Sequence, residues 1–347
     1  MSRHLQTLLA IESTCDETAA AVIDRERRVL ASAVASQQEL HERFQGVVPE
    51  LAARAHLERI APIVAQVIEE SHIDPRRDLA AVAVATEPGL PGSLLVGLAA
   101  AKALCVGWDK PLVSINHVQA HVYACQIGRK ESIFPCLGIV ISGGHTNLYH
   151  CHGANHWLYL GGTIDDAVGE AFDKVAVMLG LPYPGGPHLS RLAKLGNPHA
   201  YKLPRPMLAD RTTLSLSFSG LKTAVRYQLA GTGKQDFSTL ELSEQQRADM
   251  AASFQLAAID CIIGKTTLAL EQTRLPRLCV GGGVAANELL RERLTTTAQS
   301  MGCELLLAPP DLCTDNAIMG AIAWEKVDRG DFASLDIDIH PGLLRGM

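Results

Sequence analysis

The chain has 347 residues, of which 47% are apolar, 20% charged and 5% aromatic, and its formal net charge is −6. At roughly 150 residues per domain this length suggests about two domains, and the apolar content excludes an intrinsically disordered chain. The negative charge and the scarcity of aromatic residues disfavour a protein that coats nucleic acid by charge or base stacking alone, although a local basic patch can still bind a folded RNA.

The cysteines and the apolar stretches indicate the compartment. The nine cysteines are scattered and none forms a C-x-x-C pair, which predicts buried thiols in a reducing compartment. Residues 7–11 are too short for the apolar part of a secretory signal, and Glu12 follows them. The longest nearly apolar stretch, 94–108, contains Lys102 and is shorter than a membrane span. We therefore expect a cytoplasmic protein with no membrane contact.

Short apolar strands alternate with amphipathic helices along the chain, which indicates an α/β fold. In the first part, strands are predicted at 8–12 and 19–24 around a polar turn at 13–18, followed by a helix over 48–70 and a strand over 79–86. A tight turn at 87–93 comes next, and Ser93 is expected to cap the helix that follows.

The same opening of strand, small polar turn and strand recurs at 136–151, which suggests a duplicated fold. Residues 180–240 are rich in proline and glycine and are predicted to form an insertion with short helices. The remaining predicted elements are a long helix over 243–272, a strand over 277–280, a helix from Ala286, a strand over 303–307 and a closing helix from about Thr314.

Two histidines have the spacing of metal ligands. His117 and His121 are four residues apart, so on a helix both imidazoles face the same way. Asp315 could complete a His₂-carboxylate site with them; the alternative is a pair of surface or capping histidines. The zinc-peptidase motif H-E-x-x-H needs a glutamate after the first histidine, where this chain has Val118. A peptidase is therefore disfavoured.

Three glycine-containing turns each follow an apolar strand, after 79–86, 136–141 and 277–280. Small residues let backbone N–H groups approach a phosphate, so together these turns favour a nucleotide site, although each alone is typical of an ordinary tight turn. Residues 264–267 imitate the end of a Walker A loop, but Ile259 occupies the position of its first glycine. Residues 281–286 formally fit a dinucleotide-binding turn. Such a fold needs an acidic residue at the end of the next strand, whereas Glu304 lies at the start of that strand, so a dehydrogenase is disfavoured.

Acidic pairs supply further candidates. Asp16 and Glu17 lie in the first turn, and Asp165 and Asp166 are predicted to begin a helix. The second pair is either functional or a pair of N-terminal charges that the helix dipole favours.

Together these motifs closely resemble one family, TsaD, the tRNA N6-adenosine threonylcarbamoyltransferases, also called O-sialoglycoprotein endopeptidase-like proteins. The resemblance extends from about residue 8 to 320. Its motifs are 11–18 (IESTCDET), 46–52 (GVVPELA), the two histidines, 142–146 (SGGHT), 165–174 (DDAVGEAFDK), 183–187 (YPGGP), 217–223 (SFSGLKT), 282–287 (GGVAAN) and 313–316 (CTDN). Glu87 and Gln119 depart from the pattern, because the family commonly has glycine at the first position and an acidic residue at the second.

The resemblance implies the actin-like ATPase (ASKHA) fold, with two duplicated RNase H-like domains around a nucleotide cleft. We expect the first domain at 1–115, completed by the C-terminal helix at about 320–347. The second domain is expected at 116–319, with 180–240 as its insertion.

The resemblance also implies the reaction, which is transfer of the threonylcarbamoyl group from threonylcarbamoyl-AMP to N6 of adenosine 37 in tRNAs that read codons beginning with A. It implies one divalent metal, Fe²⁺ or else Zn²⁺, on His117, His121 and Asp315. Residues Val140, Ile141, Ser142, Gly143, Gly144, Asp173, Gly186 and Asn287 would bind the adenylate. The general base is open, with Asp16, Glu17 and Glu12 as candidates.

The implied partners are tRNA, a separate enzyme that supplies the adenylate and, in a bacterium, a TsaB-like paralogue and a TsaE-like ATPase. Two alternatives remain. A small-molecule kinase or ATPase of the same fold would turn over ATP without tRNA and would not need the histidine pair. A catalytically silent scaffold would lack His117, His121 and Asp315, and this chain has all three.

Overall fold

The computed structural model describes residues 7–231 and 241–342. The chain divides into two compact units, unit 1 with residues 1–133, 153–156 and 308–347 and unit 2 with residues 134–152 and 157–307. The domain boundaries expected from the sequence, after residues 115 and 319, differ from these. In the structure, His117, His121 and Asp315 therefore all belong to unit 1.

Unit 1 contains a five-stranded sheet in the order β3-β2-β1-β4-β5. Its strands are β1 (Thr7–Glu12), β2 (Glu17–Asp24), β3 (Val29–Ser36), β4 (Leu79–Glu87) and β5 (Leu112–Asn116). β1 pairs antiparallel with β2 and parallel with β4. The central strand is completely buried because helices cover both of its faces.

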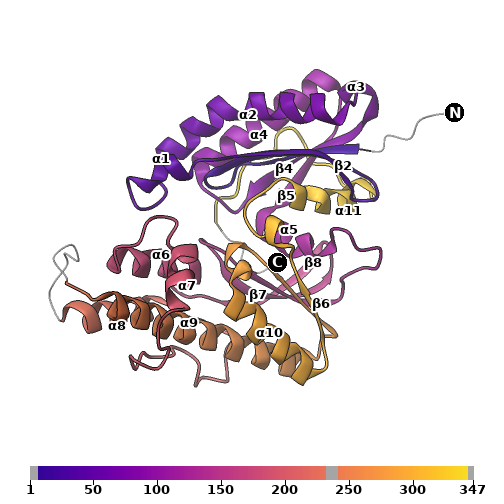
Figure 1. Cartoon of the computed structure of the whole chain (residues 1–347). Helices are drawn as coiled ribbons and strands as arrows, with labels where there is room; N and C mark the ends of the chain where they lie inside the picture. The colour runs from indigo at the N-terminus through magenta and orange to yellow at the C-terminus, as the bar shows by residue number, and fades with distance from the viewer. Residues whose placement is uncertain (1–6, 232–240, 343–347) are drawn as a thin grey trace. The chain divides into compact units, whose positions relative to one another are not determined.

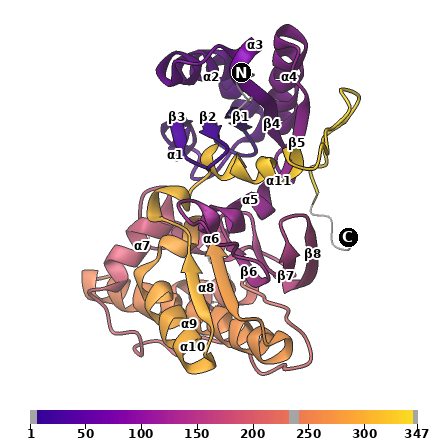
Figure 2. The same cartoon turned by 90° about the vertical axis from the view of Figure 1, so that its right-hand side faces the viewer.

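The helices of unit 1 lie on the two faces of this sheet. α2 (Pro49–Ser71) and α4 (Pro91–Trp108) pack on one face, as Figure 1 and Figure 2 both show. The short helices η4 (Ile318–Ile322) and α11 (Ala323–Val327) contact the strands from the other face. The other helices of this unit are α1 (Gln38–Glu42), α3 (Pro75–Asp78), α5 (His117–Tyr123), η1 (Ala124–Gln126) and η3 (Pro310–Leu312).

Unit 2 repeats this topology. Its sheet has the order β10-β9-β6-β7-β8, where β6 pairs antiparallel with β7 and parallel with β9, as β1 does with β2 and β4. The strands are β6 (Cys136–Ile141), β7 (Thr146–Gly153), β8 (His156–Gly162), β9 (Arg277–Gly281) and β10 (Glu304–Leu307). The helices are α6 (Val168–Met178), α7 (Gly185–Ala193), α8 (Ser219–Ala230), α9 (Glu244–Thr273), η2 (Gly283–Ala286) and α10 (Glu288–Met301). The duplicated α/β fold predicted from the two hairpins is confirmed.

Several predicted element starts are corrected. Leu90 is the N-cap of α4 and Pro91 its first residue, whereas Ser93 is buried and its hydroxyl donates to the carbonyl of Cys15 at 3.2 Å. Proline is favoured at the first helical position because it needs no partner for an N–H group. The helix expected from Ala286 begins at Glu288, after the 3₁₀ turn η2. The closing helix expected from Thr314 begins as the 3₁₀ turn η4 at Ile318.

Among the residues that the structure describes, two helices, α4 and α9, have the length and hydropathy of a membrane span. α4 begins at Pro91 and not at Leu94, so the expectation that this stretch is too short is wrong. Length and composition are weak indicators, because core helices of soluble proteins share them. The most apolar part of α9 is 78% buried, and this helix packs against α7 and α10. α4 packs against α2 and β4.

Within the predicted insertion at 180–240, the structure describes α7, an irregular segment and α8, and residues 232–240 lie outside the described residues. Lys265 of the false Walker motif lies inside α9, with its side chain buried. Its ammonium group donates to the carbonyl oxygens of Asp210, at 2.5 Å, and Thr213, at 2.8 Å. The lysine therefore holds the irregular segment against the helix.

Candidate functional site: a buried metal centre and a nucleotide-binding region

The two histidines lie on one face of α5, as their spacing predicts. Asn116 caps this helix, because its side-chain oxygen accepts the N–H of Gln119 at 3.1 Å. The side-chain amide of Asn116 donates to Glu87 Oε1 at 3.2 Å. Glu87 thus lies beside the helix that carries the histidines, and its carboxylate orients the capping amide.

The side chain of Asp315 meets those of His117 and His121 at the surface of α5. Nε2 of His121 lies 3.2 Å from Asp315 Oδ1, and Nε2 of His117 lies 3.6 Å from the same atom. One ligand atom from each of the three side chains lies within 4.8 Å of the other two. His117 is 4% exposed and His121 is 0% exposed, so both imidazoles are buried, whereas the side chain of Asp315 is partly exposed. The predicted His₂-carboxylate cluster forms within unit 1.

The hydrogen bonding of His121 supports a metal cation as the partner of this side chain. Within 7–231 and 241–342, neither ring nitrogen of this fully buried side chain has a hydrogen-bond partner. Leaving buried polar atoms unpaired costs free energy, and native proteins avoid it. A divalent cation between the two imidazoles and the carboxylate would satisfy Nε2, and this donor set is typical of Zn²⁺ or Fe²⁺ sites. The residues therefore fit the metal that the resemblance implies.

His117 differs from His121 because carboxylates lie at both of its nitrogens. Burial by itself lowers the pKa of His117, but the charges of Glu12 and Asp315 outweigh it and raise this pKa to about 9. Nδ1 lies 3.0 Å from Glu12 Oε2 and 3.2 Å from the hydroxyl of Thr14. The contact with Glu12, which is 105 residues away in the chain, was not predicted.

The acidic turn between β1 and β2 contains the other two candidates for the general base. Burial, followed by the charges of Asp16 and Asp315, raises the pKa of Glu17 from 4.5 to about 10. The same causes raise the pKa of the Cys15 thiol. Glu17 therefore carries a proton at neutral pH in the metal-free protein.

His56 of α2 holds this turn through two hydrogen bonds, a role that was not predicted. Its Nε2 lies 3.1 Å from the carbonyl oxygen of Cys15, which can only accept, so Nε2 carries the proton. Its Nδ1 then accepts the hydroxyl of Thr18 at 2.7 Å. Burial lowers the pKa of His56, so the ring is neutral.

The residues expected to bind the adenylate all lie in unit 2, at the ends of β6 and β9 and on the helices beside them. Val140 and Ile141 are fully buried, so only their backbone groups are available. Ser142 closes the following turn, because its N–H donates to the carbonyl of His145 at 2.7 Å and its hydroxyl accepts the N–H of His145 at 3.1 Å.

Two glycines let other segments approach this turn closely. A Cβ on Gly169 would lie 2.6 Å from the carbonyl oxygen of Ser142, and a Cβ on Gly282 would lie 2.5 Å from that of Ile141. Gly282 also has a φ of +95°, which favours glycine. Gly143 and Gly144, in contrast, have open space on the side where a Cβ would project. The turn is therefore closely packed at Ile141 and Ser142 and open at Gly143 and Gly144.

Asp173 and Asn287 hold backbone in place around this region. Asp173 Oδ1 accepts the N–H groups of Gly185 and Gly186, at 2.8 and 3.1 Å, at the start of α7. Asn287 caps α10 through the N–H of Leu290 and donates to Ser190 Oγ at 2.9 Å. It also donates to Gln255 Oε1 at 2.8 Å. Gln255, a polar residue within the buried stretch of α9, is a signal that the sequence analysis missed.

Asp165 and Asp166 have structural partners. Asp165 accepts the hydroxyl of Ser217 at 2.6 Å and the N–H of Phe218 at 2.9 Å, at the start of α8. These hydrogen bonds outweigh burial and lower the pKa of Asp165. Asp166 forms ion pairs with Lys174 and Lys222. α6 begins only at Val168, so the expectation that the two aspartates begin that helix is wrong, and Asp165 serves α8 instead.

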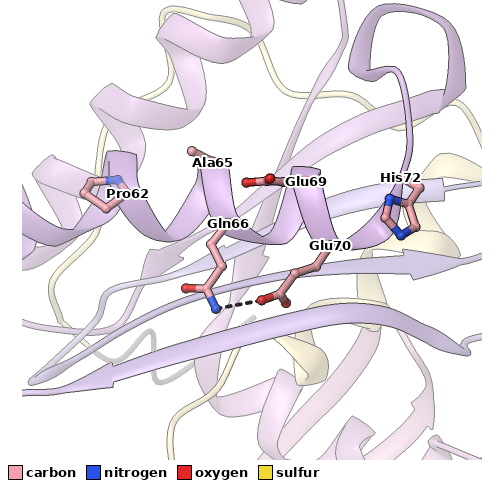
Figure 3. Close-up of a pocket in the computed structure, with 6 residues that line it drawn as sticks. All are labelled: Pro62, Ala65, Gln66, Glu69, Glu70 and His72. Atoms are coloured by element: carbon pink, nitrogen blue, oxygen red, sulfur yellow. Dashed lines mark hydrogen bonds between the residues drawn. The ribbon is translucent and has the colours of Figure 1, made fainter.

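A hollow of about 670 Å³ lies along the end of α2. It is lined by Pro62, Ala65, Gln66, Glu69, Glu70 and His72 (Figure 3). Its polar groups are exposed, and the amide of Gln66 donates to Glu70 at 2.9 Å. All of its lining comes from this one helix and its C-cap, so it lacks the convergent polar groups that are typical of a substrate site.

The comparison with known proteins agrees with these arrangements. A family model for TsaD, tRNA N6-adenosine threonylcarbamoyltransferase, matches residues 28–322. A tRNA N6-adenosine threonylcarbamoyltransferase from Rhodopirellula baltica is 54% identical to this chain, covering 98% of both sequences. One from Symbiobacterium thermophilum is 46% identical, covering 98% of this chain and 97% of the relative.

Solved structures with low sequence identity share the fold. HypF from T. kodakarensis is 12% identical, with a TM-score of 0.61 over 94% of this chain and 49% of HypF. Component A of the Acidaminococcus fermentans (R)-2-hydroxyglutaryl-CoA dehydratase is 15% identical, with a TM-score of 0.52 over 93% of this chain and 99% of that one. These neighbours have the actin-like ATPase fold, as expected for this chain. The family model and the full-length relatives show that the chain belongs to the TsaD family of tRNA N6-adenosine threonylcarbamoyltransferases.

Proposed function

We propose that this enzyme takes the threonylcarbamoyl group from threonylcarbamoyl-AMP, transfers it to N6 of adenosine 37 in tRNAs that read codons beginning with A, and releases AMP. We further propose that His117, His121 and Asp315 hold one divalent metal, Fe²⁺ in preference to Zn²⁺, on which the activity depends. The observation that carries the proposal is the buried pair of imidazoles facing one carboxylate, in which neither ring nitrogen of His121 forms a hydrogen bond among the described residues and Nε2 lies 3.2 Å from Asp315 Oδ1.

The chemistry explains why such a site is useful. The donor is a mixed anhydride of a carbamic acid and a phosphate, so AMP is a good leaving group, whereas the N6 amine of adenosine is a weak nucleophile. When bound, the metal would supply a Lewis acid that polarises or positions an oxygen of the donor. Because the rings of His117 and His121 are buried, electrostatic interactions on their side of this position are stronger than they would be in water.

We assign the adenylate part of the donor to unit 2. The open side of the Gly143–Gly144 turn exposes backbone that can approach a phosphate. Asp173 binds the N–H groups of Gly185 and Gly186, so its role is to fix the start of α7. Gly186 has open space where a Cβ would project, which leaves room for the nucleoside. Asn287 would act from an orientation set by Ser190 and Gln255.

Among the three candidates for the general base, we favour Asp16. Both oxygens of Glu12 have partners, because Oε1 accepts the N–H of Thr14 at 2.6 Å and Oε2 faces His117. Burial and the charges of Asp16 and Asp315 raise the pKa of Glu17 to about 10 in the metal-free protein, which makes Glu17 a poor proton acceptor at neutral pH in that state. Asp16 lies beside Glu17 in the same turn and would accept the proton that N6 loses.

We also propose the partners that the resemblance implies: an enzyme that supplies the adenylate, a TsaB-like paralogue and a TsaE-like ATPase, with tRNA as the substrate, in the cytoplasm. The two outer helices of unit 1 carry exposed apolar side chains at which the proposed partners can be tested. Leu57 of α2 is 65% exposed, and Leu95 and Val106 of α4 are 50% and 70% exposed.

Donor binding tests the assignment to unit 2. We expect calorimetry to show tighter binding of threonylcarbamoyl-AMP than of ATP to the metal-loaded enzyme. Asp173→Ala should weaken binding of the adenylate by about 10-fold or more, because two backbone N–H groups lose their acceptor and α7 can shift. Glu292→Ala, which removes an exposed carboxylate of α10, is the matched control. Equal or tighter ATP binding, unaffected by Asp173→Ala, would favour the kinase or ATPase alternative.

A further inference from the structure

The proposed metal site contains a carboxylate that is not one of its ligands. Glu12, the last residue of β1, is 3% exposed and lies 3.0 Å from Nδ1 of His117 through Oε2. The other nitrogen of the same ring, Nε2, lies on the Asp315 side, 3.6 Å from its Oδ1. The carboxylate of Glu12 therefore contacts the edge of His117 opposite the expected metal position.

The backbone holds Glu12 rigidly in this position. β1 is the central strand of the unit 1 sheet, with β2 on one side and β4 on the other. The N–H of Thr14 donates to Oε1 of Glu12 at 2.6 Å, which fixes the rotation of the carboxylate and directs Oε2 at the imidazole. The hydroxyl of Thr14 lies 3.2 Å from the same Nδ1. The imidazole thus has a fixed acceptor on the side away from the metal.

A carboxylate accepts hydrogen bonds and cannot donate them, so Nδ1 of His117 carries the proton in this contact. Nε2 is then the nitrogen that can offer its lone pair to a cation. Histidine ligands in metalloproteins commonly have such a partner, which sets the tautomer and ring orientation and increases the basicity of the ligand. Nδ1 of His121 has no such hydrogen-bond acceptor among the described residues. His117 is therefore the ligand whose ring orientation is fixed by a neighbouring carboxylate.

We infer that Glu12 is a positioning residue of the metal centre: it holds His117 so that Nε2 faces the cation, and it takes no part in the chemistry itself. The inference rests on the proposed metal site. It assigns to Glu12 a role different from that of a general base. It also links the first motif of the chain, 11–18, to the histidine motif more than 100 residues later.

The test measures metal affinity, with Zn²⁺ as the probe and a chromophoric chelator as competitor. Removing a group that supports a ligand typically costs about 10- to 100-fold in affinity, so we expect Glu12→Ala to weaken Zn²⁺ binding by that factor. Glu12→Gln should fall between Glu12→Ala and the wild type, because its single amide oxygen cannot serve both Thr14 and His117. Glu12→Gln also keeps the volume of the side chain if Glu12→Ala fails to fold.

The matched control is Glu87→Gln, which changes a second carboxylate near α5. Glu87 contacts Asn116 and not the ring of either histidine, and glutamine can still accept the Asn116 amide. We expect wild-type Zn²⁺ affinity for this variant. A separate readout is NMR of the Zn²⁺-loaded protein, where the proton on Nδ1 of His117 should exchange with water faster in Glu12→Ala because its acceptor is gone.

The outcomes separate the two proposals. If the wild type does not bind Zn²⁺, the proposed metal site fails. If the wild type binds Zn²⁺ and the folded Glu12 variants bind it equally well, the site stands and the role of Glu12 is refuted. If Glu87→Gln weakens binding as much as Glu12→Ala does, the effect comes from general disturbance of α5, which also refutes the inference.

Discussion

Replacing His121 with leucine is expected to remove metal binding without destabilising the metal-free protein. Neither ring nitrogen of His121 forms a hydrogen bond among the described residues. The substitution removes the 3.2 Å contact of Nε2 with Asp315 Oδ1, but Asp315 keeps its contact with His117 and is partly exposed to water, so it is not left buried without a partner. The same substitution removes one of the three ligands. The loss in affinity should exceed the roughly 10- to 100-fold cost of removing a group that only supports a ligand.

Chemical denaturation with and without Zn²⁺ checks both parts. A ligand at 100 times its dissociation constant stabilises the folded state by about 2.7 kcal/mol, so the wild type should gain this amount on addition of the metal and His121→Leu should gain none. His199→Ala, which removes an exposed histidine of unit 2, should respond like the wild type. A folded His121→Leu protein that keeps the stabilisation would contradict the assignment of His121 as a ligand.

Replacing Glu17 with glutamine is expected to stabilise the metal-free protein at neutral pH. Burial and the charges of Asp16 and Asp315 raise the pKa of Glu17 to about 10, against 4.5 for an unperturbed carboxyl. The folded state must therefore bind a proton that the unfolded state has released, so the unfolding free energy falls as the pH rises from about 4.5 to about 10. Glutamine cannot ionise, so it removes this cost.

At pH 7 the cost has an upper bound of about 3 kcal/mol, from the interval between 4.5 and 7 at 1.36 kcal/mol per pH unit. We expect Glu17→Gln to approach this gain at pH 7 and to show almost none at pH 4.5, in urea titrations of the metal-free protein. The hydroxyl of Ser36, 3.4 Å from Glu17 Oε1, can still donate to the amide oxygen.

The control is Glu58→Gln, which changes an exposed carboxylate on α2. It should leave the unfolding free energy nearly unchanged at both pH values. Two other titratable side chains, His41 and His56, lie on the helices beside the turn that contains Glu17. Both are buried, and burial lowers the pKa of each. If Glu17→Gln gains nothing at pH 7, Glu17 is ionised in the folded protein and becomes available again as a general base.

Local patterns predicted most of the fold. The strands at 8–12 and 136–141, the helix over 48–70 and the long helix over 243–272 are confirmed within one to two residues, because their apolar periodicity is strong. β3 was not predicted, because it is an edge strand made largely of small residues with an irregular burial pattern. The four-residue spacing of His117 and His121 correctly predicted a shared helix face.

Contacts between distant segments could not be predicted from local patterns. Nothing near Glu12 in the sequence shows that its carboxylate contacts His117. Asp165 looked like part of the helix that follows it, but its partners lie at the start of α8, more than 50 residues later. The unit boundaries differ from those expected because α5 packs against η4 and the β4–β5 strands, which belong to unit 1. Such pairings depend on the tertiary fold, which places these segments together.

The most direct measurement is transfer of a ¹⁴C-labelled threonylcarbamoyl group from synthetic threonylcarbamoyl-AMP to unmodified tRNA, with the metal-loaded chain and the proposed TsaB-like and TsaE-like proteins. We expect label on N6 of adenosine 37, release of one AMP for each group transferred, and loss of transfer with His121→Leu. Transfer that is equally fast with His121→Leu would contradict the metal-dependent site. ATP turnover without any labelled tRNA would contradict the transferase itself.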